Sequence, residues 1–192
     1  MTDQQFIELL RSRQAELQRL LSRTLPIKIG ALAKAHFQQN FRLGGYVNGG
    51  LQPWPITKRQ LSGGASASGQ YGPLLSGRNR LMSSIAYRTA PLETTIYTAV
   101  PYAAIHNVGG IVSPSVTAKM RRFAWAMYYK NRGSGKAESP EANRWKALAL
   151  TRKKKLSVRI PRRQFMGDSQ ELSQAISSKI SSEINSLLIP NS

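Results

Sequence analysis

The segment 96–110 predicts a strand, a short helix and a glycine stop in direct succession. Ile96, Thr98 and Val100 alternate with Tyr97 and Ala99, which is the period-two pattern of a half-buried strand. Pro101 then has the fixed φ that suits the first position of a helix. A short helix over 102–107 must end at Gly109 or Gly110, because glycine adopts the left-handed conformation without steric cost. This succession fixes a tight corner in the chain.

A second corner is predicted at 160–167, directly before the last helix. Pro161 and Gly167 bracket it, and Arg163 and Phe165 lie between them. Proline and glycine limit where a helix or strand can continue, so this segment is expected to be compact and irregular.

These two segments resemble the Mu-type phage virion morphogenesis family, the tail-completion proteins of tailed phages. The resemblance extends from about residue 30 to residue 170 and includes further matches in the order of that family: Asn40-Phe41 with Gly44-Gly45, Trp54, 74–78 with Leu81 and Ser84-Ile85, and 115–123. It implies that the corner residues form a structural motif: Pro101, Tyr102, His106, Gly109, Gly110, Pro161, Arg163, Phe165 and Gly167.

The same resemblance implies a structural protein of the virion, located in the tail or neck after assembly in the host cytoplasm. Such tail-completion or tail-terminator proteins cap the tail tube and dock to the head connector at the head–tail junction. A homo-oligomeric, hexameric ring is implied, with tail-tube and head-connector proteins as partners.

Helical periodicity and capping signals predict the terminal helices. Thr2 with Gln5 forms a capping-box pattern for an N-terminal helix or arm over 1–25. Thr24 and Pro26 indicate a second helix start, and Gly44 the end of that helix. Asp168 with Glu171 predicts another capping box, at the start of a C-terminal helix over 168–189.

The remaining pattern predicts an α+β fold in one domain, 1–192. The Gly-, Ser- and Pro-rich segment 43–76 is expected to be a mobile loop, with Trp54 pinning it to the core. Strands over 85–90 and 95–100 should form an antiparallel hairpin, and 156–160 should add a third strand to the same small sheet. Amphipathic helices are needed to cover that sheet.

The formal net charge of +19 predicts a polyanionic partner, which could be nucleic acid, an acidic protein ring or an anionic membrane surface. Much of the charge lies in a basic helical insert, 111–155. The candidate contacts to an acidic partner or to genomic DNA are Arg121, Arg122, Arg152, Lys153, Lys154 and Lys155. An alternative function is therefore nonspecific nucleic-acid binding through the basic segment 119–163. Aromatic residues of the insert are expected to pack at helical spacing more than to stack on bases.

Catalysis is not predicted. The chain has two histidines, nine carboxylates and no cysteine, and no catalytic or metal-binding spacing occurs, so no cofactor is expected. His36 falls on an apolar helix stripe and is expected to be a hydrogen-bonded core histidine. His106 has the same expectation at the corner. No apolar run approaches the length of a membrane span, which is about 20 residues, so no membrane association is predicted.

Overall fold

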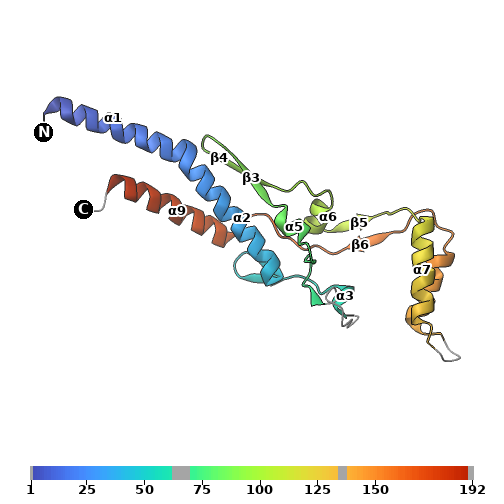
Figure 1. Cartoon of the computed structure of the whole chain (residues 1–192). Helices are drawn as coiled ribbons and strands as arrows, with labels where there is room; N and C mark the ends of the chain where they lie inside the picture. The colour runs from blue at the N-terminus through green and yellow to red at the C-terminus, as the bar shows by residue number, and fades with distance from the viewer. Residues whose placement is uncertain (1, 62–69, 134–137, 190–192) are drawn as a thin grey trace. The chain divides into compact units, whose positions relative to one another are not determined.

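The computed structural model describes residues 2–61, 70–133 and 138–189, which fall in two compact units (Figure 1). Unit 1 comprises 1–109 and 161–192, and unit 2 comprises 110–160. Helices and short two-stranded antiparallel sheets make up both units, so the predicted α+β class is confirmed. Unit 2 contains the predicted basic insert.

Unit 1 begins with two helices that are continuous through a π turn. Helix α1 (Asp3–Arg19) starts at the capping box that Thr2 and Gln5 predict, and α2 (Leu25–Leu43) ends at Gly44, whose φ is 66°. Helix α2 has Thr24 at its N-cap and Pro26 in its first turn, as predicted, and the π turn Leu20–Thr24 joins it directly to α1. A proline inside a helix clashes with the carbonyl group four residues earlier, and the wider π turn relieves this crowding before Pro26.

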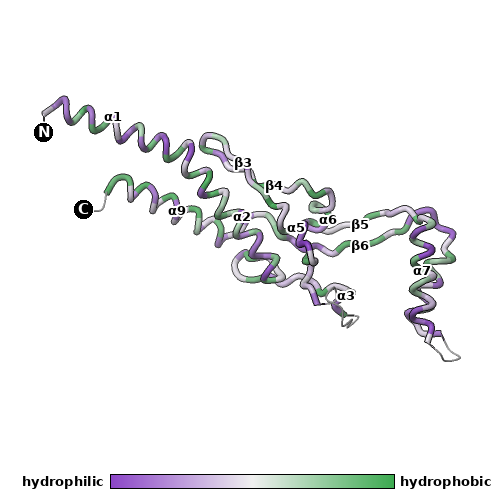
Figure 2. Tube along the Cα trace, in the orientation of Figure 1, coloured by the Kyte–Doolittle hydropathy of each residue, from purple (hydrophilic) through white to green (hydrophobic). Residues whose placement is uncertain are grey.

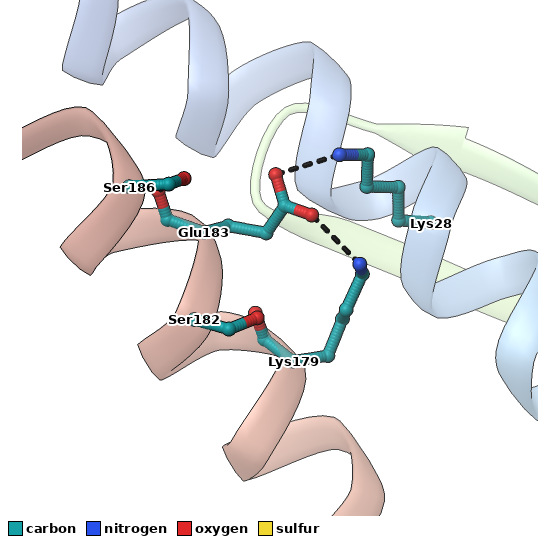
Figure 3. A network of polar contacts seen from close by, with 5 residues as sticks. All are labelled: Lys28, Lys179, Ser182, Glu183 and Ser186. Carbon is teal, nitrogen blue, oxygen red and sulfur yellow. Dashed lines mark hydrogen bonds and ion pairs between the residues drawn. The ribbon is translucent and has the colours of Figure 1, made fainter. Parts of the chain in front are cut away.

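Helix α9 (Gln170–Leu188) lies beside α1 and α2, and the N-terminal end of α1 and the C-terminal end of α9 lie at the same end of this helical layer (Figure 1). An ion-pair network connects α9 to α2: Glu183 accepts hydrogen bonds from Lys28 Nζ at 2.6 Å and from Lys179 Nζ at 2.8 Å (Figure 3). The N-cap of α9 is Ser169, whose hydroxyl oxygen accepts from Leu172 N at 3.2 Å, so the predicted capping box at Asp168 is wrong.

Part of the segment 43–76 forms regular structure that its composition does not predict. Strands β1 (Gly45–Val47) and β2 (Leu51–Pro53) pair in an antiparallel hairpin, and α3 (Lys58–Leu61) follows. The Glu171 carboxylate accepts from the amides of Gly49 and Gly50 at 3.2 and 2.8 Å, which ties the hairpin loop to the start of α9. Residues 62–69 of the predicted loop lie outside the described residues.

A second hairpin packs on α2. Helix α5 (Arg80–Ser83) leads into β3 (Ala86–Ala90), which pairs with β4 (Glu93–Tyr97) in the predicted antiparallel arrangement. The second strand ends at Tyr97, earlier than predicted, and helix α6 (Ala103–Val108) follows it. The predicted third strand is not in this sheet, because 158–160 pairs elsewhere.

The buried core of unit 1 is formed by α2, α5, α6, α9, the residues that flank the two hairpins and the segment after Pro161. Phe41 is fully buried and contacts Trp54 and Phe165, with ring centroids 5.5 and 5.1 Å apart. Trp54 is itself buried, which confirms that it fixes the segment 43–76 to the core. The other buried members of this core are Ala33, Phe37, Leu81, Ile85, Val100, Ala103 and Leu172.

The first and last strands of unit 2 pair with each other. Strand β5 (Gly110–Val112) pairs antiparallel with β6 (Val158–Ile160), and a further bridge joins Ser115 to Lys155. Between them, α7 (Ala118–Asn131) and α8 (Pro140–Leu150) pack against each other. Ser139 is the N-cap of α8, and its hydroxyl oxygen accepts from Ala142 N at 3.1 Å. Among the described residues, no helix is long and apolar enough to span a bilayer.

Candidate interaction sites

The segment 161–167 has no regular secondary structure, yet groups from other elements bond its backbone. The Arg163 amide donates to the His106 carbonyl oxygen at 2.8 Å, and Trp54 Nε1 donates to the Gln164 carbonyl oxygen at 2.7 Å. Asn40, which is fully buried in α2, donates through Nδ2 to the Phe165 carbonyl oxygen at 3.1 Å. Buried backbone groups must find such partners, so side chains here replace a sheet ladder.

Asn107 makes the densest set of these contacts. Its Oδ1 accepts from the amides of Phe165 and Met166 at 2.8 and 3.0 Å, and its Nδ2 donates to the Met166 carbonyl oxygen at 3.0 Å. One side chain in α6 thus holds two consecutive peptide groups of the second corner. Neither Asn107 nor Asn40 is among the predicted site residues, although both lie within the motifs that carry the family resemblance.

Glycine is required at two corner positions. Gly109 has a φ of 74°, and a Cβ there would lie 2.8 Å from the Arg162 backbone nitrogen. Gly167 has a φ of 149°, and a Cβ there would lie 2.4 Å from Gln164 Nε2. The first conflict is with backbone, which has less freedom to move than a side chain. Gly110 also has a positive φ, 147°, and begins β5.

The other predicted motif residues differ in burial. Phe165 is 1% exposed and belongs to the core, whereas Pro101 and Pro161 are exposed at the two corners. Tyr102 is 42% exposed at the N-cap of α6, and its ring meets the His106 ring edge-on with centroids 5.8 Å apart. The structure therefore brings the two predicted corners together, and hydrogen bonds from backbone groups and from the Asn107 side-chain amide join them.

The two histidines are packed as expected, but not hydrogen-bonded as expected. Within the described part of the chain, His36 Nε2 and His106 Nδ1 are buried and have no hydrogen-bond partner, so these two ring nitrogens do not make the predicted bonds. Burial lowers the pKa of both imidazoles, and the positive charge of Arg163 lowers the pKa of His106 further. His106 contributes to the corner through its carbonyl oxygen.

Arg163 is a buried cation. Only 7% of the residue is exposed, and its Nε and Nη2 donate to the Pro55 carbonyl oxygen at 3.1 and 2.9 Å. Burial lowers the pKa of the guanidinium, which nevertheless stays protonated in proteins. No carboxylate forms an ion pair with it among the described residues.

The candidate basic contacts in unit 2 are of two kinds. Arg121 is partly buried and donates through Nη1 to the Ala149 carbonyl oxygen at 2.9 Å, so it joins α7 to the C-terminal end of α8. Arg122 and the run 152–155 are exposed. The run is also ordered, because Val116 N donates to the Lys154 carbonyl oxygen at 2.9 Å and extends the strand pair.

Aromatic side chains in unit 2 pack on one another. Phe123 of α7 meets Trp145 of α8 edge-on at 5.7 Å, and Trp125 stacks on Tyr129 at 6.0 Å between ring centroids. The predicted preference for packing is confirmed for these pairs. Tyr128 is buried and donates to Glu138 at 2.5 Å, and Lys146 bonds the same carboxylate at 3.1 Å.

The distinctive elements of the described part of the chain are its two bonded corners and its exposed apolar and basic surfaces. Among the described residues, no group of three or more His, Cys, Asp or Glu side chains could hold a metal ion. The chain belongs to the phage virion morphogenesis family, which matches residues 3–185. It is therefore a virion-associated structural or morphogenesis protein of a phage, in a family that is not known for enzymes. Searches among curated proteins and solved structures gave no match.

Proposed function

We propose that the protein completes or terminates the phage tail at the head–tail junction. In this role it forms a homo-oligomeric ring, hexameric as the family resemblance implies, which caps the tail tube and docks to the head connector. Family membership over residues 3–185 supports a morphogenesis role. The single structural observation that supports subunit contacts is the state of α1, in which no residue is buried.

Helix α1 has four large apolar side chains that are about half exposed in the described part of the chain. Phe6, Ile7, Leu9 and Leu10 are 46–53% exposed, and hydrophobic positions recur along this part of the helix (Figure 2). Complete burial of such a side chain contributes about 1.5–3 kcal/mol. Because about half of each is exposed, the four together offer about 3–6 kcal/mol per contact before the costs of association. In a ring, a neighbouring copy of the chain would cover these side chains of α1.

Two measurements test this role. Phage that lack the protein should give unjoined heads and tails, or tails of uncontrolled length, in negative-stain images. Complementation with Phe6→Ser/Leu10→Ser should fail, while Gln14→Ser/Gln18→Ser on the same helix should restore infectious particles. Normal particles without the protein would refute the proposal, and so would full rescue by the Phe6/Leu10 variant.

A second candidate function is nonspecific nucleic-acid binding by unit 2, and the distribution of charge favours it. Unit 2 contains thirteen Lys and Arg residues and two Glu residues, so it carries +11 of the formal charge of +19. Lys153, Lys154 and Lys155 are exposed and consecutive, and Lys155 pairs with Ser115 in an isolated bridge. The genome at the head–tail junction would be the nucleic acid that such a surface meets in the virion.

Salt-dependent DNA binding tests this second function. Replacing the three lysines by alanine should weaken binding and reduce the slope of log K against log[salt] by up to about 3, since each phosphate contact releases about one counterion. The matched control removes three exposed arginines from unit 1, in Arg11→Ala/Arg19→Ala/Arg23→Ala. Equal effects of both triple variants would assign binding to net charge alone, and an unchanged slope in the lysine variant would refute contact by unit 2.

A further inference from the structure

A surface pocket of unit 1 contains the buried cation described above. It measures about 340 Å³, within the range of small-ligand sites, which begins at about 300 Å³. Arg163, Arg80, His106, Tyr102 and Thr57 supply its polar groups. Leu74, Leu75 and Leu81 supply apolar walls. The pocket thus combines two arginines with an apolar surface.

The charge of Arg163 has no compensation in this pocket. Buried charges in proteins are normally paired, because leaving water is costly for an unpaired ion. None of the described residues that line the pocket is Asp or Glu, and the only acceptor described for the guanidinium is the neutral carbonyl oxygen of Pro55. A negative counter-group from outside the described residues would complete the site.

The geometry of the guanidinium indicates which negative group fits. Nε and one N–H of Nη2 are used on the Pro55 carbonyl oxygen. A guanidinium has five N–H donors in a fixed plane, so the Nη1 and Nη2 edge remains for a planar acceptor. A carboxylate matches such an edge with two parallel hydrogen bonds. His106 lines the same pocket, and its buried Nδ1 lacks a partner among the described residues.

We propose that this pocket binds the carboxylate of another polypeptide, held by Arg163 and Arg80, with the adjoining apolar side chain against the leucine wall. The apolar wall favours a C-terminal carboxylate on a residue such as leucine over the carboxylate of an acidic side chain. The same wall disfavours phosphate, whose higher charge and hydration suit a more polar site. The inference does not depend on a ring or on a place in the tail.

Binding should be coupled to the protonation of His106. The charged and aromatic groups described beside this imidazole are the cationic Arg163 and the Tyr102 ring, and Arg80 lines the same pocket. Burial and Arg163 lower the pKa of His106. A carboxylate in the pocket favours the protonated imidazole, so the pKa of His106 should rise on binding. By linkage, affinity should increase as the pH falls through that pKa.

Ligand titrations of the full chain, followed by NMR of the His106 ring, test the proposal. N-acetyl-leucine should shift the His106 signals and raise its pKa at millimolar concentrations, while N-acetyl-leucine amide should not. N-acetylglutamate α-amide tests a side-chain carboxylate and should bind more weakly. Inorganic phosphate tests a general anion site. Equal binding of the leucine acid and its amide, equal or tighter binding of phosphate, or no saturable shift with any probe would overturn the proposal.

Substitutions locate the site. Arg80 is exposed, so Arg80→Gln should keep the fold and weaken N-acetyl-leucine binding roughly tenfold, as expected for one charge-assisted hydrogen bond. Arg88→Gln, an exposed position on β3 outside the pocket, is the control and should bind like the wild type. Arg163→Lys should weaken binding by more, and its thermal unfolding shows whether it is folded. Unchanged affinity in Arg80→Gln would refute the assignment even if Arg163→Lys does not fold.

Discussion

Removal of the Asn107 side chain should destabilise unit 1 far more than its partly exposed position suggests. Asn107→Ala leaves the amides of Phe165 and Met166 without their acceptor. Phe165 is 1% exposed, so water has little access there, whereas Gln164 Nε2 at 3.4 Å still reaches the Met166 carbonyl oxygen. An unsatisfied buried amide costs about 1–3 kcal/mol, and Met166 is less buried, so we expect a total loss of about 2–4 kcal/mol.

Trp54 provides a local reporter of this loss. Its Nε1 bonds the Gln164 carbonyl oxygen, and the other tryptophans, Trp125 and Trp145, can be changed to phenylalanine in the reference protein. Urea unfolding followed by Trp54 fluorescence should give the lower stability. The melting temperature should fall by roughly 5–15 °C, because 1 kcal/mol corresponds to about 2–4 °C in a chain of this size.

Two further variants test whether the loss comes from the hydrogen bonds of Asn107. Asn185→Ala, an exposed asparagine in α9 of the same unit, is the control and should change stability by less than about 0.5 kcal/mol. Asn107→Asp keeps an oxygen acceptor for both amides but loses the donor to Met166, so its stability should lie between the wild type and Asn107→Ala. A loss of less than about 0.5 kcal/mol in Asn107→Ala would refute the claim that this side chain holds the second corner.

The remaining predictions concern backbone conformation and pH. Gly109→Ala should cost more than Gly44→Ala in urea unfolding, because Gly44 has a φ of 66° with open space around it, whereas a Cβ on Gly109 meets the Arg162 backbone. We expect about 1–2 kcal/mol at Gly44 and a larger loss at Gly109, and equal losses would contradict the steric argument. Glu183 has a pKa below its ordinary 4.5 because two lysines bond it, so its stabilising effect is present above that value and disappears as the pH falls through the folded pKa. Thermal melts should therefore show Glu183→Gln less stable than wild type near pH 7, with the difference shrinking as the pH falls below 4.5, and a constant difference would refute the ion-pair role.

Local signals in the sequence predict the helices well. Thr2 and Gln5 form the capping box they predict, and Gly44 takes the left-handed conformation that ends α2. The error at α9 is instructive, because Asp168 and Ser169 are both good N-caps. Glu171, which would complete a capping box with Asp168, instead accepts from the amides of Gly49 and Gly50, and Ser169 caps the helix.

Strand pairing is predicted less well because it depends on which distant segments meet. The hairpin β3–β4 is found, since its connection is short, but β6 pairs with β5 and not with that hairpin. Three-residue strands such as β1 and β5 have too few residues to show an alternating pattern. Tyr46 is nevertheless buried, and its hydroxyl donates to the Asp168 carbonyl oxygen at 2.5 Å, a contact across 122 positions that no local pattern encodes.

The corner residues are predicted by type, but the connections between them are not. Glycine and proline reveal where the backbone must turn, and Phe165 reveals a core anchor. The side chains that bond the corner, Asn107 and Asn40, are ordinary polar residues whose role depends on what lies opposite. The burial of Arg163 and its bonds to the Pro55 carbonyl oxygen are not predicted either, because arginine in a sequence normally indicates an exposed surface.

The pairing of Gly110 with Ile160 has a consequence for how this chain can vary and fold. The chain leaves unit 1 after Gly109 and returns at Pro161, so the two crossing points are neighbours once β5 and β6 have paired. The entropy of closing this excursion rises only slowly with its length, by about 0.6 kcal/mol per doubling. Lengthening, shortening or exchanging the α7–α8 hairpin should therefore leave the nucleation and packing of the remaining chain almost unaffected, which makes it a place where related proteins can acquire different surfaces on a common base.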